Sequence, residues 1–149
     1  MPERLRSLAA RLKEYVGNRR HARRFTVRLK VKISLLEINH GKTITLKTSP
    51  VAGVTRDVSS DGLGLIVPHI RVDEHYLMAD HRMLRVTLIC PDGDVTIDCA
   101  PVRYEQLEQS DAEHGYLLGM EIKEIPDEYR ERWDEFLKNA NGRAKNGSK

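Results

Sequence analysis

Four arginines fall within six positions near the N-terminus, in the run Arg19-Arg20-His21-Ala22-Arg23-Arg24. Guanidinium groups this close repel one another, so the segment needs an anionic or planar ligand to organise it. The planar fork of arginine clamps two phosphate oxygens or a guanine edge at once, and it stacks flat on a purine. These residues therefore predict a site for a small anion or nucleotide. The alternative is a solvated basic segment, which an isolated basic run more often is.

A second cluster of polar residues is Asp57-Val58-Ser59-Ser60-Asp61-Gly62, between two strand-like segments. Asp57 offers only acceptors and Ser59 offers a hydroxyl, and two positions apart on a strand their side chains point the same way. Gly62 has no side chain, so a ligand or another backbone can approach closely. Taken alone, this pattern is more often a polar turn than a binding site.

The segments around these two motifs have the two-residue period of β-strands. Apolar and polar residues alternate from Phe25 to Leu35, which predicts a half-buried strand. Residues 68–82 have no clear period and are expected to form a loop with room for one short helical turn. Further strands separated by short turns are expected at residues 43–47, 54–59, 63–67, 83–90, 95–105 and 116–125. The pattern predicts an all-β core in the form of a small antiparallel barrel.

Helical periodicity is found only at the two ends of the chain. Residues 3–16 predict a short amphipathic helix that packs on the domain or on a second copy, with binding to a membrane surface as the less favoured alternative. Pro126 begins a second helix with Tyr129, Trp133, Phe136 and Leu137 on one stripe. The predicted organisation is an N-terminal helix (1–18), a barrel domain with the arginines (19–125), a C-terminal helix (126–140) and a disordered tail (141–149).

The charge distribution limits the classes of ligand. The 149 residues carry a formal net charge of +3, but residues 1–32 hold 11 Lys+Arg against 2 Asp+Glu, which leaves 14 against 20 for the rest. A basic segment on an acidic body argues against binding of long DNA or RNA and favours a small anion. Aromatic residues, at 5%, are also too few for a surface that stacks single-stranded nucleic acid.

Cys90 and Cys99 flank an expected hairpin turn at residues 91–94, which would set Cys90 opposite Val95 and Cys99 opposite Val86, too far apart for a disulfide. The six histidines are scattered, and none is at zinc-ligand spacing from a cysteine. No apolar stretch reaches the roughly 20 residues of a membrane span, and no signal peptide is visible. We expect a cytoplasmic protein without a metal, cofactor or membrane span.

Taken together, the two motifs resemble those of the PilZ family of bacterial cyclic di-GMP receptors. The family signature is Arg-x-x-x-Arg before the first strand and Asp/Asn-x-Ser-x-x-Gly on the barrel, and the matching residues are Arg20, Arg24, Asp57, Ser59 and Gly62. The resemblance extends from about residue 19 to residue 125, and residues 118–122 look like the last barrel strand of the family.

Arg19 and Arg23 have the same spacing as Arg20 and Arg24. Family members usually carry an aromatic residue and a strand after the second arginine, and Phe25 fills that place for the Arg20–Arg24 frame. In the family, an arginine just before the frame is associated with a stacked pair of ligands. The resemblance therefore implies that Arg19 and Arg23 help to bind a second cyclic di-GMP, whose phosphates would otherwise repel those of the first.

The resemblance implies a six- to seven-stranded antiparallel PilZ-like β-barrel that binds cyclic di-GMP. Arg20 and Arg24 would bind guanine O6/N7 or phosphate and stack on a purine, and Asp57 would accept from the guanine N1–H and amino group. Ser59 would hydrogen-bond the ligand, and Gly62 would keep the turn open beside it.

The expected function is a non-catalytic receptor whose arginine arm, residues 19–24, folds onto the barrel with ligand and signals to a downstream protein partner. The alternative is an interaction scaffold, linked to motility or the cell envelope, with a vestigial nucleotide site. An enzyme is the least favoured class, because no nucleophile–base pair, metal cluster or phosphate-binding Gly-rich helix start is visible. Whether the protein forms a homodimer is left open.

Overall fold

The computed structural model describes residues 23–107 and 115–147, with side chains described as far as Ala140. The helix expected at residues 3–16 lies outside the described residues, as do Arg19 and Arg20 of the arginine arm.

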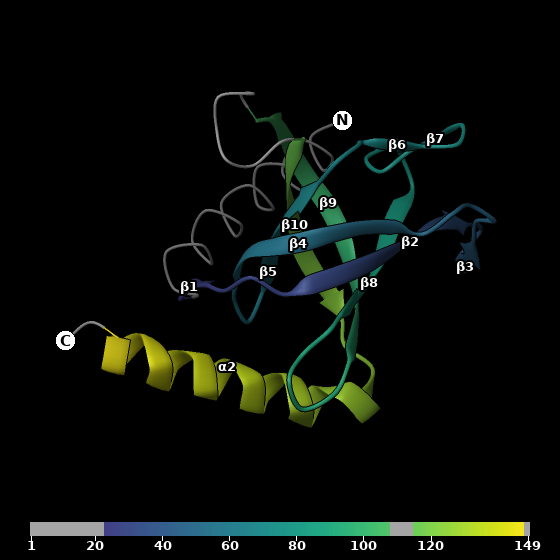
Figure 1. Cartoon of the computed structure of the whole chain (residues 1–149). Coiled ribbons are helices and arrows are strands. Elements are labelled where there is room, and N and C mark those ends of the chain that lie inside the picture. The colour runs from purple at the N-terminus through teal and green to yellow at the C-terminus, as the bar shows by residue number, and fades with distance from the viewer. Residues whose placement is uncertain (1–22, 108–114, 148–149) are drawn as a thin grey trace, which may run out of the picture.

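The fold is an antiparallel barrel closed by six strands (Figure 1). The strands β2, β4, β5, β10, β9 and β8 are hydrogen-bonded in that cyclic order, because β2 pairs with both β4 and β8. Two further strands extend the sheet, β1 beside β4 and β3 beside β2. The bounds are β1 Phe25–Thr26, β2 Lys30–Asn39, β3 Lys42–Thr45, β4 Val51–Val58, β5 Gly62–Val67, β8 Arg82–Leu88, β9 Val95–Gln106 and β10 Tyr116–Glu124. The predicted PilZ-like barrel with a C-terminal helix is confirmed for the described residues.

Alternation along the strands builds the interior. In β2, Val31, Ile33 and Leu35 are buried, whereas Lys30 before them and Lys32 between them are exposed. Strand β8 contributes buried residues in the same way, and every residue of β5 is buried. Burial of these apolar surfaces is the main stabilising term of such a barrel. The inward-facing residues of β8 and β9 are Leu84, Val86, Leu88, Val95, Ile97 and Cys99.

Helix α2 (Asp127–Gly147) lies across one end of the barrel (Figure 1). Trp133 is 1% exposed and stacks on Phe136 with a ring-centroid distance of 5.6 Å. Tyr129 and Leu137 also pack against the core, so the stripe predicted from the sequence is the buried face of the helix. The acidic residues of the first turn favour the helix start through its dipole.

Helix α2 also continues further than expected. The predicted boundary at residue 140 is too early. Residues 141–147, assigned to a disordered tail, belong to the helix. The Asn and Gly residues of this stretch are weak helix formers and suggested an end, but Arg143, Ala144 and Lys145 are favourable, and extending an existing helix is easier than starting one.

Two strand predictions need correction. The alternation from Phe25 to Leu35 is not one strand, because β1 ends at Thr26 and β2 begins at Lys30. The loop expected at residues 68–82 contains a small hairpin, β6 (Arg71–Val72) and β7 (His75–Tyr76). Pairs this short have no readable period in a sequence.

The register of the β8–β9 hairpin also differs from the prediction. Leu84 is opposite Cys99 and Leu88 is opposite Val95, so Cys90 lies beyond the ladder in a connection longer than a tight turn. This connection contacts α2, because Arg132 of the helix donates to the Asp94 carbonyl at 2.7 Å. Both cysteines are buried and free, as expected.

Candidate ligand-binding site

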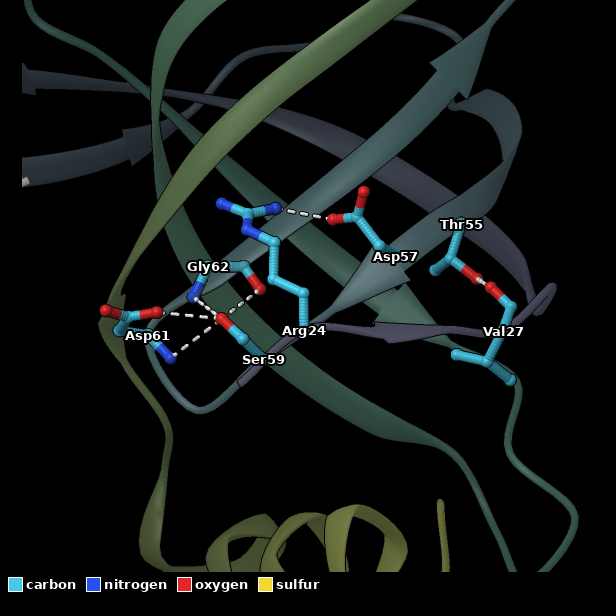
Figure 2. Close-up of polar contacts among 7 residues, drawn as sticks. All are labelled: Arg24, Val27, Thr55, Asp57, Ser59, Asp61 and Gly62. Atoms are coloured by element: carbon cyan, nitrogen blue, oxygen red, sulfur yellow. Dashed lines mark hydrogen bonds and ion pairs between the residues drawn. The ribbon is translucent and has the colours of Figure 1, made fainter. Parts of the chain in front are cut away.

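Arg24 and Asp57 meet on the outside of the barrel (Figure 2). Arg24 Nη1 donates to Asp57 Oδ1 at 2.5 Å, and the two side chains are 27% and 25% exposed. The pairing of β1 with β4 explains the contact, because it sets Phe25 opposite Val58 and Thr26 opposite Asp57. The last residue of the arginine arm is thereby held beside the carboxylate.

A bulge in β4 turns Asp57 to the outer face. Thr55 pairs with Leu65 and Asp57 pairs with Gly64, so Arg56 is the extra residue. Thr55 and Val58 are both fully buried, whereas unbroken alternation would have buried Asp57 with Thr55. The bulge therefore leaves Arg56 exposed and brings the carboxylate to the surface.

Two glycines lie in line with Asp57 across the sheet. Asp57 pairs with Gly64, Gly64 pairs with Gly119, and Gly119 pairs with Arg103. A Cβ on Gly64 would lie 2.8 Å from Asp57 Oδ1, and a Cβ on Gly119 would lie 3.3 Å from Arg103 Cγ. We call these four residues the cross-strand row, in which a carboxylate and an arginine stem both lie over bare backbone.

A cavity of about 310 Å³ opens above this row. Its wall is mostly polar and includes three arginines and two carboxylates, which suits an anionic ligand with hydrogen-bonding edges. The lining residues are Arg24, Arg56, Asp57, Gly64, Arg103, Tyr104, Glu105, Leu117 and Gly119.

Ser59 is fully buried, and its hydroxyl is used within the turn between β4 and β5 (Figure 2). The hydroxyl donates to Asp61 Oδ1 at 2.7 Å and accepts from the Gly62 N–H at 3.0 Å. Gly62 itself is tightly enclosed, because a Cβ there would lie 2.9 Å from the Met120 carbonyl oxygen and 3.5 Å from Arg24 Nη2. This turn therefore supports the surface on which the Arg24 side chain lies.

Thr55 hydrogen-bonds the backbone of the segment between β1 and β2, which follows the arginine arm. Its buried hydroxyl donates to the Val27 carbonyl at 2.5 Å (Figure 2). The same hydroxyl accepts from the Leu29 N–H at 2.7 Å, and the Thr55 N–H donates to the Leu29 carbonyl at 2.8 Å. These bonds satisfy the backbone between β1 and β2, which has no ladder partner there. Nothing in the sequence marks Thr55, because one threonine in a strand is ordinary.

The family model of the PilZ domain matches residues 18–139. The chain belongs to the PilZ domain family. The solved PilZ domain with c-di-GMP of YcgR from Escherichia coli has a TM-score of 0.57 at 10% identity, covering 87% of this chain and 97% of that one. MrkH, described as a c-di-GMP-dependent transcription regulatory factor, has a TM-score of 0.45 at 17% identity, covering 78% of this chain and 49% of that one. No curated protein sequence matches the chain.

Among the predicted residues, this PilZ barrel brings together Arg24, Asp57, Ser59 and Gly62. The guanidinium carbon of Arg23 lies 5.9 Å from the centroid of the Phe25 ring.

The PilZ motif did not point to several residues that line the cavity or support it, which are Thr55, Arg56, Gly64, Arg103, Tyr104 and Gly119. A partial signal was present, because isolated glycines inside strands often mark places where another group approaches the backbone closely.

No three His, Cys, Asp or Glu side chains of residues 23–107 and 115–147 gather where a metal ion could bind. In the same part of the chain, no helix is both long enough and apolar enough to cross a membrane.

Proposed function

We propose that this PilZ domain is a receptor for cyclic di-GMP and has no catalytic activity. The observation that carries the proposal is the Arg24–Asp57 pair beside the glycine-floored cavity. Guanine presents acceptors at O6 and N7 and donors at N1 and its amino group. A carboxylate and a guanidinium held together complement these edges, and arginine also binds the phosphates.

The pair between Arg24 and Asp57 leaves room for a ligand. A guanidinium has five N–H donors and a carboxylate has about four lone-pair sites, and the ion pair uses one Nη1 donor and Oδ1. Asp57 Oδ2 can accept from a guanine N–H, and the remaining donors of Arg24 can bind phosphate or guanine O6/N7. Arg20 joins Arg24 in this role when the arm folds over the ligand.

Ser59 and Gly62 belong to the proposed site, chiefly because they shape the turn between β4 and β5 beside it. The buried Ser59 hydroxyl holds the turn in shape, and the absence of a side chain at Gly62 keeps space for Arg24 and the ligand. Arg19 and Arg23 supply charge for a second, stacked cyclic di-GMP. The residues that we propose to bind the ligand are therefore the same as those predicted from the sequence.

The arginine arm is connected to α2 through Phe25. Phe25 follows Arg24 directly and lines, with Pro91, Phe136 and Ala140, a second cavity of about 320 Å³ between β1 and α2. We propose that ligand binding folds the arginine arm onto the barrel, shifts β1 against α2 and thereby changes the surface seen by a protein partner. Few residues of β1 contact α2, so we expect such a shift to disrupt little of the packing between them.

Calorimetric titration with cyclic di-GMP tests the proposed function, with GTP and cyclic di-AMP as controls. We expect saturable binding of cyclic di-GMP and much weaker binding of both controls. Well-folded protein that gives no heat with cyclic di-GMP contradicts the proposal and favours the interaction scaffold with a vestigial site.

A further inference from the structure

We infer that Arg103 is a specificity-determining residue that reads the O6/N7 edge of a guanine while Asp57 reads its N1–H edge. This inference rests on the proposed function and adds to it a residue outside both sequence motifs. It comes from the cross-strand row, in which Arg103 and Asp57 stand at the two ends and Gly64 and Gly119 stand between them.

The row directs both end side chains toward its middle. Neighbouring strands lie about 4.8 Å apart, so three steps place the two end Cα atoms roughly 14 Å apart. The Asp57 carboxylate covers Gly64, and Arg103 Cγ and Nε lie 3.3 and 3.4 Å from the position of a Cβ on Gly119. The acceptor and the donor group are thereby brought onto one floor of the cavity, which any larger residue at either glycine would obstruct.

The guanidinium of Arg103 is available for a ligand. Over residues 23–107 and 115–147 it makes no hydrogen bond or ion pair, and the side chain is exposed. Arg85, in contrast, lies on β8, the strand paired with β9 on the side away from β10. It binds both carboxylate oxygens of Asp98, at 2.9 and 3.1 Å. Within the described residues, the five donors of Arg103 are therefore unused, and its stem is held against Gly119.

A carboxylate and a guanidinium that reach over the same floor of the cavity match guanine and mismatch adenine. The carboxylate accepts from N1–H and the amino group, and the adjacent fork donates to O6 and N7. Adenine would turn an amino group toward the guanidinium and an unprotonated N1 toward the carboxylate. With Arg103 on the base, Arg24 is left for phosphate and stacking, so the two arginines have separate roles.

The test is calorimetry on the full chain with cyclic di-GMP and with its 7-deazaguanine analogue, which lacks the N7 acceptor. Arg103→Ala should weaken cyclic di-GMP on the order of 10- to 100-fold, the usual value of a bidentate contact to guanine. Arg103→Lys keeps the charge without the fork and should lose most of the same affinity. Arg130→Ala, an exposed arginine on α2, is the charge-matched control and should bind as the wild type does.

The analogue separates base reading from general charge. The wild type should bind the 7-deaza analogue more weakly than cyclic di-GMP, and Arg103→Ala should bind the two equally. If Arg103→Ala binds cyclic di-GMP as tightly as the wild type, or keeps the full preference for it over the analogue, the inference is overturned and the proposed function stands. If the wild type does not bind cyclic di-GMP at all, the proposed function falls and the inference with it.

Discussion

Arg24 and Asp57 are 33 residues apart in the chain, and their side chains form an ion pair with Nη1 2.5 Å from Oδ1. About a quarter of each side chain is exposed, so water screens the pair, and pairs of this kind contribute about 0–1 kcal/mol to folding. Burial of the apolar interior contributes far more to the free energy of folding than this pair does. The pair is therefore a feature of the binding site, and it can be altered without loss of the barrel.

Arg24→Ala and Arg20→Ala should each remove most cyclic di-GMP binding and leave the barrel folded. Each substitution deletes a fork that binds phosphate or guanine, whereas no core contact is lost. Titration calorimetry measures the first effect, and thermal unfolding should show a shift of at most a few degrees for Arg24→Ala. Binding that survives in both variants would show that the arm is only a solvated basic segment.

Asp57→Ala should weaken cyclic di-GMP binding by on the order of 1–3 kcal/mol, the cost of a lost charged hydrogen-bond partner. Its effect on adenine analogues should be much smaller, because adenine has no matching pair of donors. The ratio of the affinities for cyclic di-GMP and cyclic di-AMP measures this. An unchanged ratio would mean that Asp57 does not read the guanine.

Gly64→Ala and Gly62→Ala should separate the site from the fold. The three atoms nearest to a new Cβ at residue 64 all belong to the Asp57 carboxylate, with Oδ1 at 2.8 Å, so the carboxylate is displaced and ligand affinity should fall on the order of tenfold with little loss of stability. At residue 62 the obstacle is the Met120 carbonyl oxygen at 2.9 Å, which cannot turn away, and overpacking of this kind costs about 1–3 kcal/mol. Urea unfolding and calorimetry on both variants measure the two effects, and equal destabilisation would contradict the distinction.

The buried thiols should make the protein less stable in alkali. Burial raises the pKa of Cys90 to about 11 and also raises the pKa of Cys99. Unfolded thiols lose their protons near pH 8.5, so above that pH the unfolded state binds fewer protons than the native state, and the free energy of unfolding falls as pH rises toward 11. Denaturant titrations at pH 8 and pH 10 measure the loss.

Lysines and tyrosines also titrate in this range, so the thiol contribution needs Cys90→Ala and Cys99→Ala as references. Each variant should lose less stability between pH 8 and pH 10 than the wild type does. Equal losses would show that the thiols do not carry this part of the pH dependence.

Two cyclic di-GMP molecules should bind per chain, because Arg19 and Arg23 can offset the repulsion between the phosphates of a stacked pair. Arg19→Leu should shift the calorimetric ratio toward one and leave tight binding of the first ligand. A ratio of one for the wild type, checked against an independent measure of active protein, would show that the two arginines are flanking charge.

Local pattern was enough to predict the architecture and the motifs. Two-residue alternation gave most of the barrel strands, and the stripe of Tyr129, Trp133, Phe136 and Leu137 gave the helix that covers one end. Arg24 and Asp57 were identified from residue types at short spacing. These features are readable because each depends on neighbours in the chain.

The tertiary structure alone decided how the site is assembled. The bulge at Arg56 turns Asp57 outward, and the register of β5, β10 and β9 places Gly64, Gly119 and Arg103 in one row with it. Sequence periodicity cannot give a bulge or a register, because both depend on which strands become neighbours and how far each is shifted along the next. The closure of six strands into a barrel is therefore what brings Arg103 within reach of a motif 46 residues before it.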